Sequence, residues 1–135
     1  MAAQTNEKAN LPALSLEKQA KEYRAAATGY RKDAAIQEQR ALDCQREANE
    51  YGEAVKLLAG LPKRKENDPL MRSGPLFMME SSFKRETKNV ETHLANVEAK
   101  LESAKEADEK AEVFEAALAA LKATQGASAQ EQPRS

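Results

Sequence analysis

The sequence contains little of what most enzymes and secreted domains depend on. Its 135 residues include one cysteine, one histidine, no tryptophan and three phenylalanines. A single cysteine, Cys44, excludes a disulfide framework and a thiolate metal cluster within the chain. A single histidine, His93, leaves no histidine-based metal site or catalytic triad that this chain could build alone. We therefore expect no metal and no cofactor, and we do not expect an enzyme.

Long hydrophobic runs and an excess of one charge are also missing. No stretch approaches the roughly 18 consecutive apolar residues that a membrane-spanning helix requires. The 21 basic residues nearly cancel the 22 acidic ones, which argues against a dedicated nucleic-acid binder. The first ten residues lack the hydrophobic core of a secretion signal. We expect a cytoplasmic protein with no membrane or nucleic-acid partner, and the sequence leaves open that it also enters the nucleus.

Alanine and charged residues dominate what is present. There are 26 alanines and 18 glutamates, whereas Leu, Ile, Val and Phe together number 21. Such a composition is too poor in large apolar residues for a conventional layered core and is typical of long helices and coiled coils. Because the charges balance, helices with salt-bridged faces explain it better than a disordered chain does.

Residues 16–58 carry an unbroken coiled-coil repeat. The repeat positions alternate in steps of four and three and are Leu16, Ala20, Tyr23, Ala27, Tyr30, Ala34, Gln37, Ala41, Cys44, Ala48, Tyr51, Val55 and Leu58. Alanine alternating with mostly larger residues lets two helix backbones approach closely, and Gln37 could fix the register. Gly60 in a left-handed conformation, followed by Pro62, would end this helix. We predict a helix over residues 13–59.

A second repeat predicts a second helix over residues 83–123. Its first part is Phe83, Thr87, Val90, Leu94, Val97, Leu101 and Ala104, and after a slip of three residues it continues as Ala107, Ala111, Phe114, Leu118 and Leu121. Such a slip is a stammer, which locally overwinds a coiled coil. Since the two helices match in length, they could pair as an antiparallel hairpin. We expect one domain over residues 11–123, with disordered ends at 1–10 and 124–135.

The connection, residues 61–82, is longer than an antiparallel helix pair needs. It begins polar and becomes apolar from Leu70 to Met79, with Ser73-Gly74-Pro75 as turn residues between two short apolar runs. The predicted fold is therefore dominated by α-helix: a long antiparallel coiled-coil helical hairpin with a small β-hairpin in the connecting segment. The apolar segment either joins strands of other chains or covers the helix ends, and we favour assembly.

This plan resembles that of a prefoldin subunit. Residues 73–80, followed by Glu86-Thr87-Lys88, Val90 and Leu94, resemble the β-type pattern of a glycine-containing turn, a hydrophobic strand, a polar cap and apolar heptads. The specific part covers about 35 residues, from Pro69 to Ser103. The chain departs from the family in its methionine-rich hairpin and in Pro75. It has room for only one hairpin, as in a β-type subunit.

The resemblance implies a subunit of a prefoldin-like hetero-oligomeric co-chaperone. Such a subunit would bind unfolded client proteins without ATP and deliver them to a chaperonin, with other prefoldin-type subunits completing a hexamer. The hairpin residues Leu70, Met71, Leu76, Phe77, Met78 and Met79 would assemble the hexamer. The client-binding tip would consist of Leu11, Leu14, Leu16, Phe114, Leu118 and Leu121.

Several residues have a plainer interpretation. The spacing of the tip residues continues the repeats, so they could simply complete the coiled coil, and we favour that interpretation. Cys44 is expected to be a small buried apolar residue, and His93 to lie on the surface beside Leu94. The alternative function is a coiled-coil scaffold or adaptor subunit of another multiprotein assembly.

Overall fold

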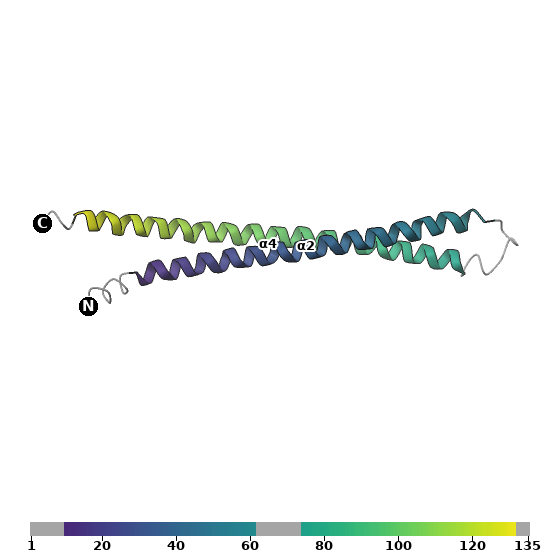
Figure 1. The fold of residues 1–135 in the computed structure, drawn as a ribbon, viewed down its shortest axis with the longest axis horizontal. Helices are drawn as coiled ribbons and strands as arrows, with labels where there is room; N and C mark the ends of the chain where they lie inside the picture. The colour runs from purple at the N-terminus through teal and green to yellow at the C-terminus, as the bar shows by residue number, and fades with distance from the viewer. Residues whose placement is uncertain (1–9, 62–73, 132–135) are drawn as a thin grey trace. The chain divides into compact units, whose positions relative to one another are not determined.

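Two long α-helices make up the described part of the chain (Figure 1). The computed structural model describes residues 10–61 and 74–131. Helix α2 spans Leu11–Ala59 and helix α4 spans Pro75–Glu131. The described residues divide into two compact units: those up to 32 and from 100 onward form unit 1, and those from 33 to 99 form unit 2. Within each unit α2 packs against α4, so the predicted helical hairpin is confirmed.

Helix α2 follows its prediction closely, except in how it ends. At its start the Leu14 amide donates to Asn10 O at 2.8 Å. At its end the Gly60 amide donates to Lys56 O at 3.2 Å, and the Leu61 amide donates to Leu58 O at 3.2 Å. No glycine in the described residues has a positive φ, so the expected left-handed Gly60 is wrong. The helix instead ends by tightening its last turn, which satisfies the final carbonyls equally well.

Helix α4 begins at Pro75, in the segment for which we predicted a β-hairpin. Residues 10–61 and 74–131 contain no strand, so that prediction is wrong for residues 74–80. Met78 donates its amide hydrogen to Gly74 O at 3.1 Å. Proline is favoured in the first turn of a helix because its missing amide hydrogen is not needed there. Leucine and methionine are good helix formers, so local propensity extends the helix through residues 76–79.

The remaining domain boundaries differ from the sequence-based ones in one further respect. Helix α4 continues through Gly126 to Glu131 instead of ending near residue 123. A single glycine costs a helix only about 1 kcal/mol relative to alanine, which is not enough to stop so long an element. Residues 1–9, 62–73 and 132–135 lie outside the described residues, and with them the predicted assembly residues Leu70 and Met71.

The face of α2 that packs against α4 is lined by alanine, as the repeat predicts. Between 0 and 7% of each of these alanines is exposed, and we call them the alanine seam: Ala13, Ala20, Ala27, Ala34, Ala41 and Ala48. The larger residues that alternate with them, such as Tyr23, Tyr30 and Tyr51, are half-buried. The buried centre of the helix pair is therefore made of small side chains, with large ones along its edges.

The facing positions of α4 differ from the prediction. In unit 1 Ala104, Ala107 and Ala111 are buried, and Phe114 beyond them is half-buried. In unit 2 Glu86 is buried, Val90, His93 and Val97 are half-buried, and Leu94 is 48% exposed. These positions alternate by four and three without a slip, so the predicted stammer is wrong.

The physical reason is helix geometry. An undistorted helix keeps one heptad register more readily than it overwinds. Alanine-containing positions fix that register in unit 1, and its continuation along α4 brings His93 toward α2 and turns Leu94 outward. The large apolar residues of 83–101 therefore follow a real repeat that is not the one packed against α2.

We predict that Ala27→Leu destabilises the helix pair. Ala27 is fully buried against Ala104 and Ala107, with Tyr30 packed beside them. A larger side chain there would force the backbones apart, and overpacking a tight core costs about 1–3 kcal/mol. The free energy of unfolding, measured by urea titration with circular dichroism, should fall accordingly. Ala26→Leu is the control, because Ala26 is exposed; equal losses in both variants would contradict a close helix approach.

Candidate protein-interaction surface

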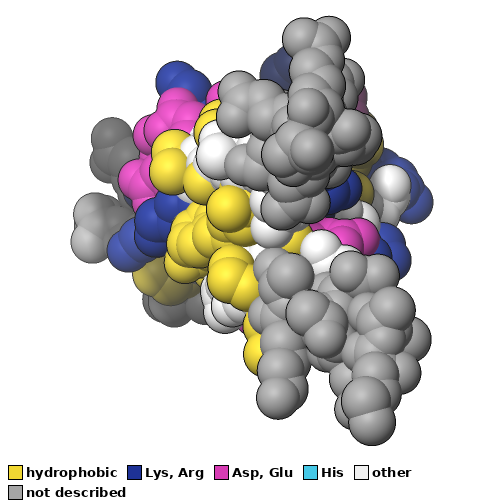
Figure 2. Space-filling model, turned by 90° about the vertical axis from the view of Figure 1, so that its left-hand side faces the viewer, with side chains coloured by type: hydrophobic (Ala, Val, Ile, Leu, Met, Phe, Trp, Pro, Cys, Tyr) yellow, Lys and Arg dark blue, Asp and Glu magenta, His cyan; other side chains and the backbone are white. Residues whose placement is uncertain are grey.

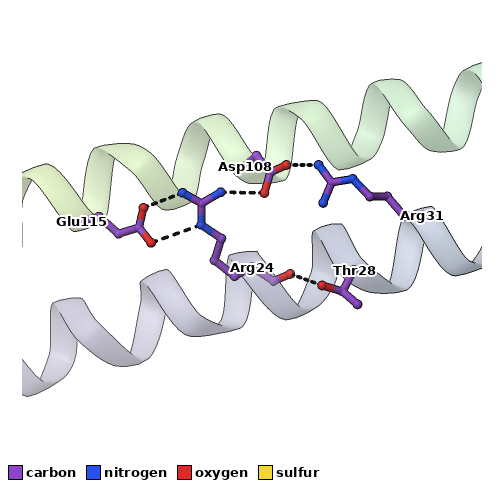
Figure 3. Close-up of polar contacts among 5 residues, drawn as sticks. All are labelled: Arg24, Thr28, Arg31, Asp108 and Glu115. Atoms are coloured by element: carbon purple, nitrogen blue, oxygen red, sulfur yellow. Dashed lines mark hydrogen bonds and ion pairs between the residues drawn. The ribbon is translucent and has the colours of Figure 1, made fainter.

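An ion network joins the two helices in unit 1 (Figure 3). Arg24 donates to Glu115 through Nε at 3.1 Å and Nη2 at 2.6 Å, and to Asp108 Oδ1 at 2.8 Å. Arg31 donates to the other oxygen of Asp108. Interactions with Arg31 and Arg24 lower the pKa of Asp108, and Arg24 lowers that of Glu115. The network fixes which turns of α2 and α4 face each other.

Aromatic contacts reinforce the same unit. The rings of Tyr23 and Phe114 lie with centroids 5.5 Å apart. Lys110 Nζ lies 5.8 Å from the Tyr23 ring and Lys100 Nζ lies 5.6 Å from the Tyr30 ring, within the range of cation–π attraction. Phe114 therefore packs against α2 within the chain, through the Tyr23 ring.

The predicted tip residues fall into two groups. Leu16, Phe114, Leu118 and Leu121 are half-buried in the helix pair, in keeping with the plainer interpretation. Leu11 is 59% exposed and Leu14 is 54% exposed. Figure 2, viewed from the left-hand side of Figure 1, shows hydrophobic side chains at the surface with charged side chains around them. Of the predicted tip, only Leu11 and Leu14 are free to contact another protein over most of their surface.

A polar layer replaces an apolar one inside unit 2. His93 Nδ1 lies 2.7 Å from Gln37 Oε1, and Asn96 Nδ2 donates to the same oxygen at 3.5 Å. His93 is half-buried, so its expected place on the surface is wrong. A polar pair at one layer of a coiled coil can fix register, at some cost in stability. Gln37 was expected to fix the register from its position in the repeat, and His93 is a polar partner that suits this role.

Glu86 is a buried carboxylate in the same unit. The residue is 6% exposed; Arg85 Nε donates to its Oε1 at 3.4 Å, and its Oε2 has no hydrogen-bond partner within the described part of the chain. Burial acts to raise the pKa of Glu86, but interactions with Cys44, Arg85 and Glu47 outweigh it, so the pKa is lowered. Interaction with Glu86 in turn raises the pKa of Glu47. The ionised Glu86 therefore favours the protonated form of Glu47.

Cys44 lies beside this pair and is half-buried. Burial, followed by interaction with Glu86, raises the pKa of its thiol. The thiolate is the reactive form of cysteine, so this environment disfavours nucleophilic and redox chemistry. The expectation of a small apolar residue fits the position.

The predicted assembly residues at the start of α4 are also divided. Leu76 and Met79 are half-buried, whereas Phe77 is 56% exposed and Met78 is 58% exposed. They lie on a helix, where neighbouring residues point in different directions, so no strand ladder presents them. Of the predicted assembly residues that the structure describes, Phe77 and Met78 are the exposed ones.

Residues 10–61 and 74–131 contain no group of three metal-ligating side chains. In the same residues no helix is long and apolar enough to cross a bilayer. The ion network of unit 1 and the burial of Glu86 were not predicted from the sequence. The spacing could have revealed the network, because Arg24 and Arg31 are seven residues apart, as are Asp108 and Glu115. No comparable pattern marks Glu86.

We predict that Glu86→Leu stabilises the chain. Glu86 Oε2 is buried without a hydrogen bond in the described part of the chain, whereas a leucine of similar size would bury only apolar surface there and gain its transfer free energy. The substitution also removes the interaction that raises the pKa of Glu47. The melting temperature at pH 7, followed by circular dichroism, should rise by several degrees. Glu38→Leu, at an exposed site on α2, is the control and should change it little. A lower melting temperature for Glu86→Leu would show that the ionised carboxylate stabilises the fold more than an apolar side chain does at this position.

A second prediction concerns acid. Because the pKa of Asp108 is lowered in the fold, its ion pairs stabilise the chain fully above its ordinary value of 3.8, and this stabilisation is lost as the pH falls from there through the lower pKa of the folded state. Asp108→Asn should therefore lower the melting temperature by a few degrees at pH 7, and the difference should vanish in stronger acid. Glu17→Gln removes only an exposed contact with Lys21 within α2 and should have little effect. A pH-independent difference for Asp108→Asn would argue against a charge interaction.

Comparison with known proteins identifies no relative. No family model, no curated protein and no solved structure matches this chain. The resemblance to β-type prefoldins therefore depends on the residues between Pro69 and Ser103 alone. A proposed function therefore depends on which side chains the helix pair exposes.

Proposed function

We propose that this chain is a coiled-coil adaptor subunit of a multiprotein assembly, and that it acts by binding other proteins without catalysing a reaction. One observation carries the proposal: among residues 10–61 and 74–125, the apolar side chains that are buried are all alanines. Large apolar side chains there are half-buried or exposed, among them Leu57 and Val113, which are 71% and 67% exposed. Exposed apolar surface of this kind is typical of proteins that bury it against partners.

The chemistry-bearing residues support a binding role. The environment of Cys44 disfavours its thiolate, and His93 is engaged with Gln37 in the helix interface. Arg24, Asp108 and Glu115 neutralise one another across the helices. These groups serve to hold α2 and α4 together, and the proposal assigns none of them a substrate.

The adaptor form of the proposal is favoured by the start of α4. In a prefoldin-like hexamer, strands of several subunits would pair, whereas residues 75–80 belong to a helix in this chain. Phe77 and Met78 are each exposed in its first turns, on adjoining sides of the helix. An exposed apolar pair on a helix suits a groove in a partner protein, where such side chains act as anchors.

A prefoldin-like co-chaperone is the second candidate, and one observation favours it. Leu11 and Leu14 are exposed on the first turns of α2, at two of the positions that the resemblance assigns to client binding. Exposed leucines on a helical support could hold unfolded proteins weakly and without nucleotide. In this form the partners would be other prefoldin-type subunits, unfolded clients and a chaperonin. Both forms include a cytoplasmic location, which microscopy of the tagged chain would test.

The proposal predicts that the tagged chain, purified natively from its own cells, brings stable partners with it. Phe77→Glu combined with Met78→Glu should reduce partner recovery at least about tenfold, because buried apolar anchors contribute most of the affinity in such interfaces. Helicity should not change, since both side chains are exposed. Ile36→Glu is the matched control: Ile36 is 51% exposed on α2, and its substitution should leave recovery intact.

Intact-mass analysis of the purified material distinguishes the candidates. A complex of about six small coiled-coil subunits would establish the prefoldin-like form. Association with one larger assembly would establish the adaptor form. Recovery of the chain with no other protein would contradict the proposed function in both forms.

A further inference from the structure

Helix α4 carries a second apolar face in unit 2, beside the one that packs against α2. We call it the outer stripe: Phe83, Thr87, Val90, Leu94 and Val97. Its members alternate by four and three, the spacing of a coiled-coil seam. Val90 and Val97 are half-buried and border both faces, whereas Phe83 is 38% and Leu94 is 48% exposed. The inward face of the same turns contains Glu86 and His93, so the outer stripe is the more apolar of the two.

Two shallow grooves border Phe83 on the surface of unit 2. A shallow groove of about 490 Å³ is lined by Phe83 and, on α2, by Asn49, Gly52, Glu53, Val55 and Lys56. A second groove of about 340 Å³ runs along α4, from Phe83 past Thr87 to Glu91. A β-carbon on Gly52 would lie 3.3 Å from the Phe83 ring. The ring therefore lies against glycine, between two open grooves.

We propose that the outer stripe is the contact face for a second copy of this chain, packed antiparallel to the first. The inference deepens the proposed function, and rests on it, by naming one partner. Its basis is the charge pattern beside the stripe, where Lys84, Glu91 and Glu98 are exposed at intervals of seven residues. This spacing places all three along one edge of the helix.

Antiparallel pairing makes this edge complementary to itself. With the twofold axis at residue 91, Lys84 faces Glu98 of the second copy, and Glu98 faces Lys84, which gives two attractive pairs. Glu91 faces its own counterpart as one repulsive pair. Charges flanking a coiled coil select its partner and orientation. The stripe supplies apolar contact, and the edge selects the antiparallel arrangement.

Sedimentation of the purified chain tests the contact face. We expect a reversible dimer, and Leu94→Glu should raise its dissociation constant by at least roughly tenfold, as loss of a central apolar anchor does. Leu42→Glu is the matched control, because Leu42 is a leucine of unit 2 that is 57% exposed on α2. Circular dichroism confirms that each variant is helical. A chain that remains monomeric at all concentrations, or a dimer as sensitive to Leu42→Glu as to Leu94→Glu, would overturn the inference.

Charge reversal tests the pairing more sharply. Lys84→Glu alone and Glu98→Lys alone should each weaken the dimer, because each turns both attractive pairs into repulsive ones. The double variant should restore the dimer, since the pairs are again opposite in sign. Glu91→Gln should strengthen it by removing the repulsive pair. A double variant as weak as the single ones would overturn the antiparallel arrangement.

A cross-link locates the axis. In a Cys44→Ala background, Glu91→Cys should form an intermolecular disulfide on mild oxidation, because the two copies of residue 91 meet at the axis. Glu98→Cys is the control and should not, since its two copies would be about 20 Å apart along the helices. Efficient cross-linking at residue 98 would contradict the inference. If the chain is monomeric but still recovers partners from cells, the inference fails and the proposed function stands.

Discussion

Alanine at every seventh residue of α2 is the constraint on which the rest of the structure depends. From Ala13 to Ala48 these positions have no side chain beyond a methyl group, and nearly all of their surface is buried. Helices lined by small residues can approach closely, but they gain little from burial of large apolar groups. Stability must then come from the edges of the interface. Large apolar residues find little room inside the chain, which explains why so many of them are exposed.

The edges of the two units are built differently. In unit 1 they combine an ion network, from Arg24 to Asp108 and Glu115, with the contact between the tilted rings of Tyr23 and Phe114. In unit 2 the interface instead contains the Gln37–His93 pair and the buried Glu86. Buried polar groups specify a register more than they contribute stability. In unit 2 these polar residues therefore set the register of α4 against α2 and add little stability. Additional apolar contact would stabilise unit 2 more than unit 1.

The sequence allowed α2 and its seam to be predicted because alanine and larger residues alternate there without ambiguity. It did not allow the register of α4 to be predicted, because two apolar repeats overlap and the larger residues, such as Leu94, follow the outward one. The prediction at residues 76–79 was wrong. The turn residues before this segment suggested strands, but the helix propensity of leucine and methionine determines the structure there. That Glu86 and His93 face α2 could not be predicted, because the register of unit 1 decides it and no local sequence pattern marks these residues. Of the candidate sites, Leu11, Leu14, Phe77 and Met78 were predicted and are exposed, whereas Phe114 was predicted as a binding residue and packs on Tyr23.

The error in α4 is itself informative about function. A heptad repeat of phenylalanine, valine and leucine carries a cost in solubility when it is exposed, and helical surfaces without a partner are usually polar. The outer stripe is a better coiled-coil seam than the face that packs against α2, yet the alanine seam and the unit 1 contacts commit α4 to the poorer one. The chain thus folds through the less apolar face of α4 and leaves the more apolar outer stripe exposed. Such a division is expected of a protein whose intramolecular pairing presents a surface for other chains, and it is difficult to explain for a hairpin that works alone.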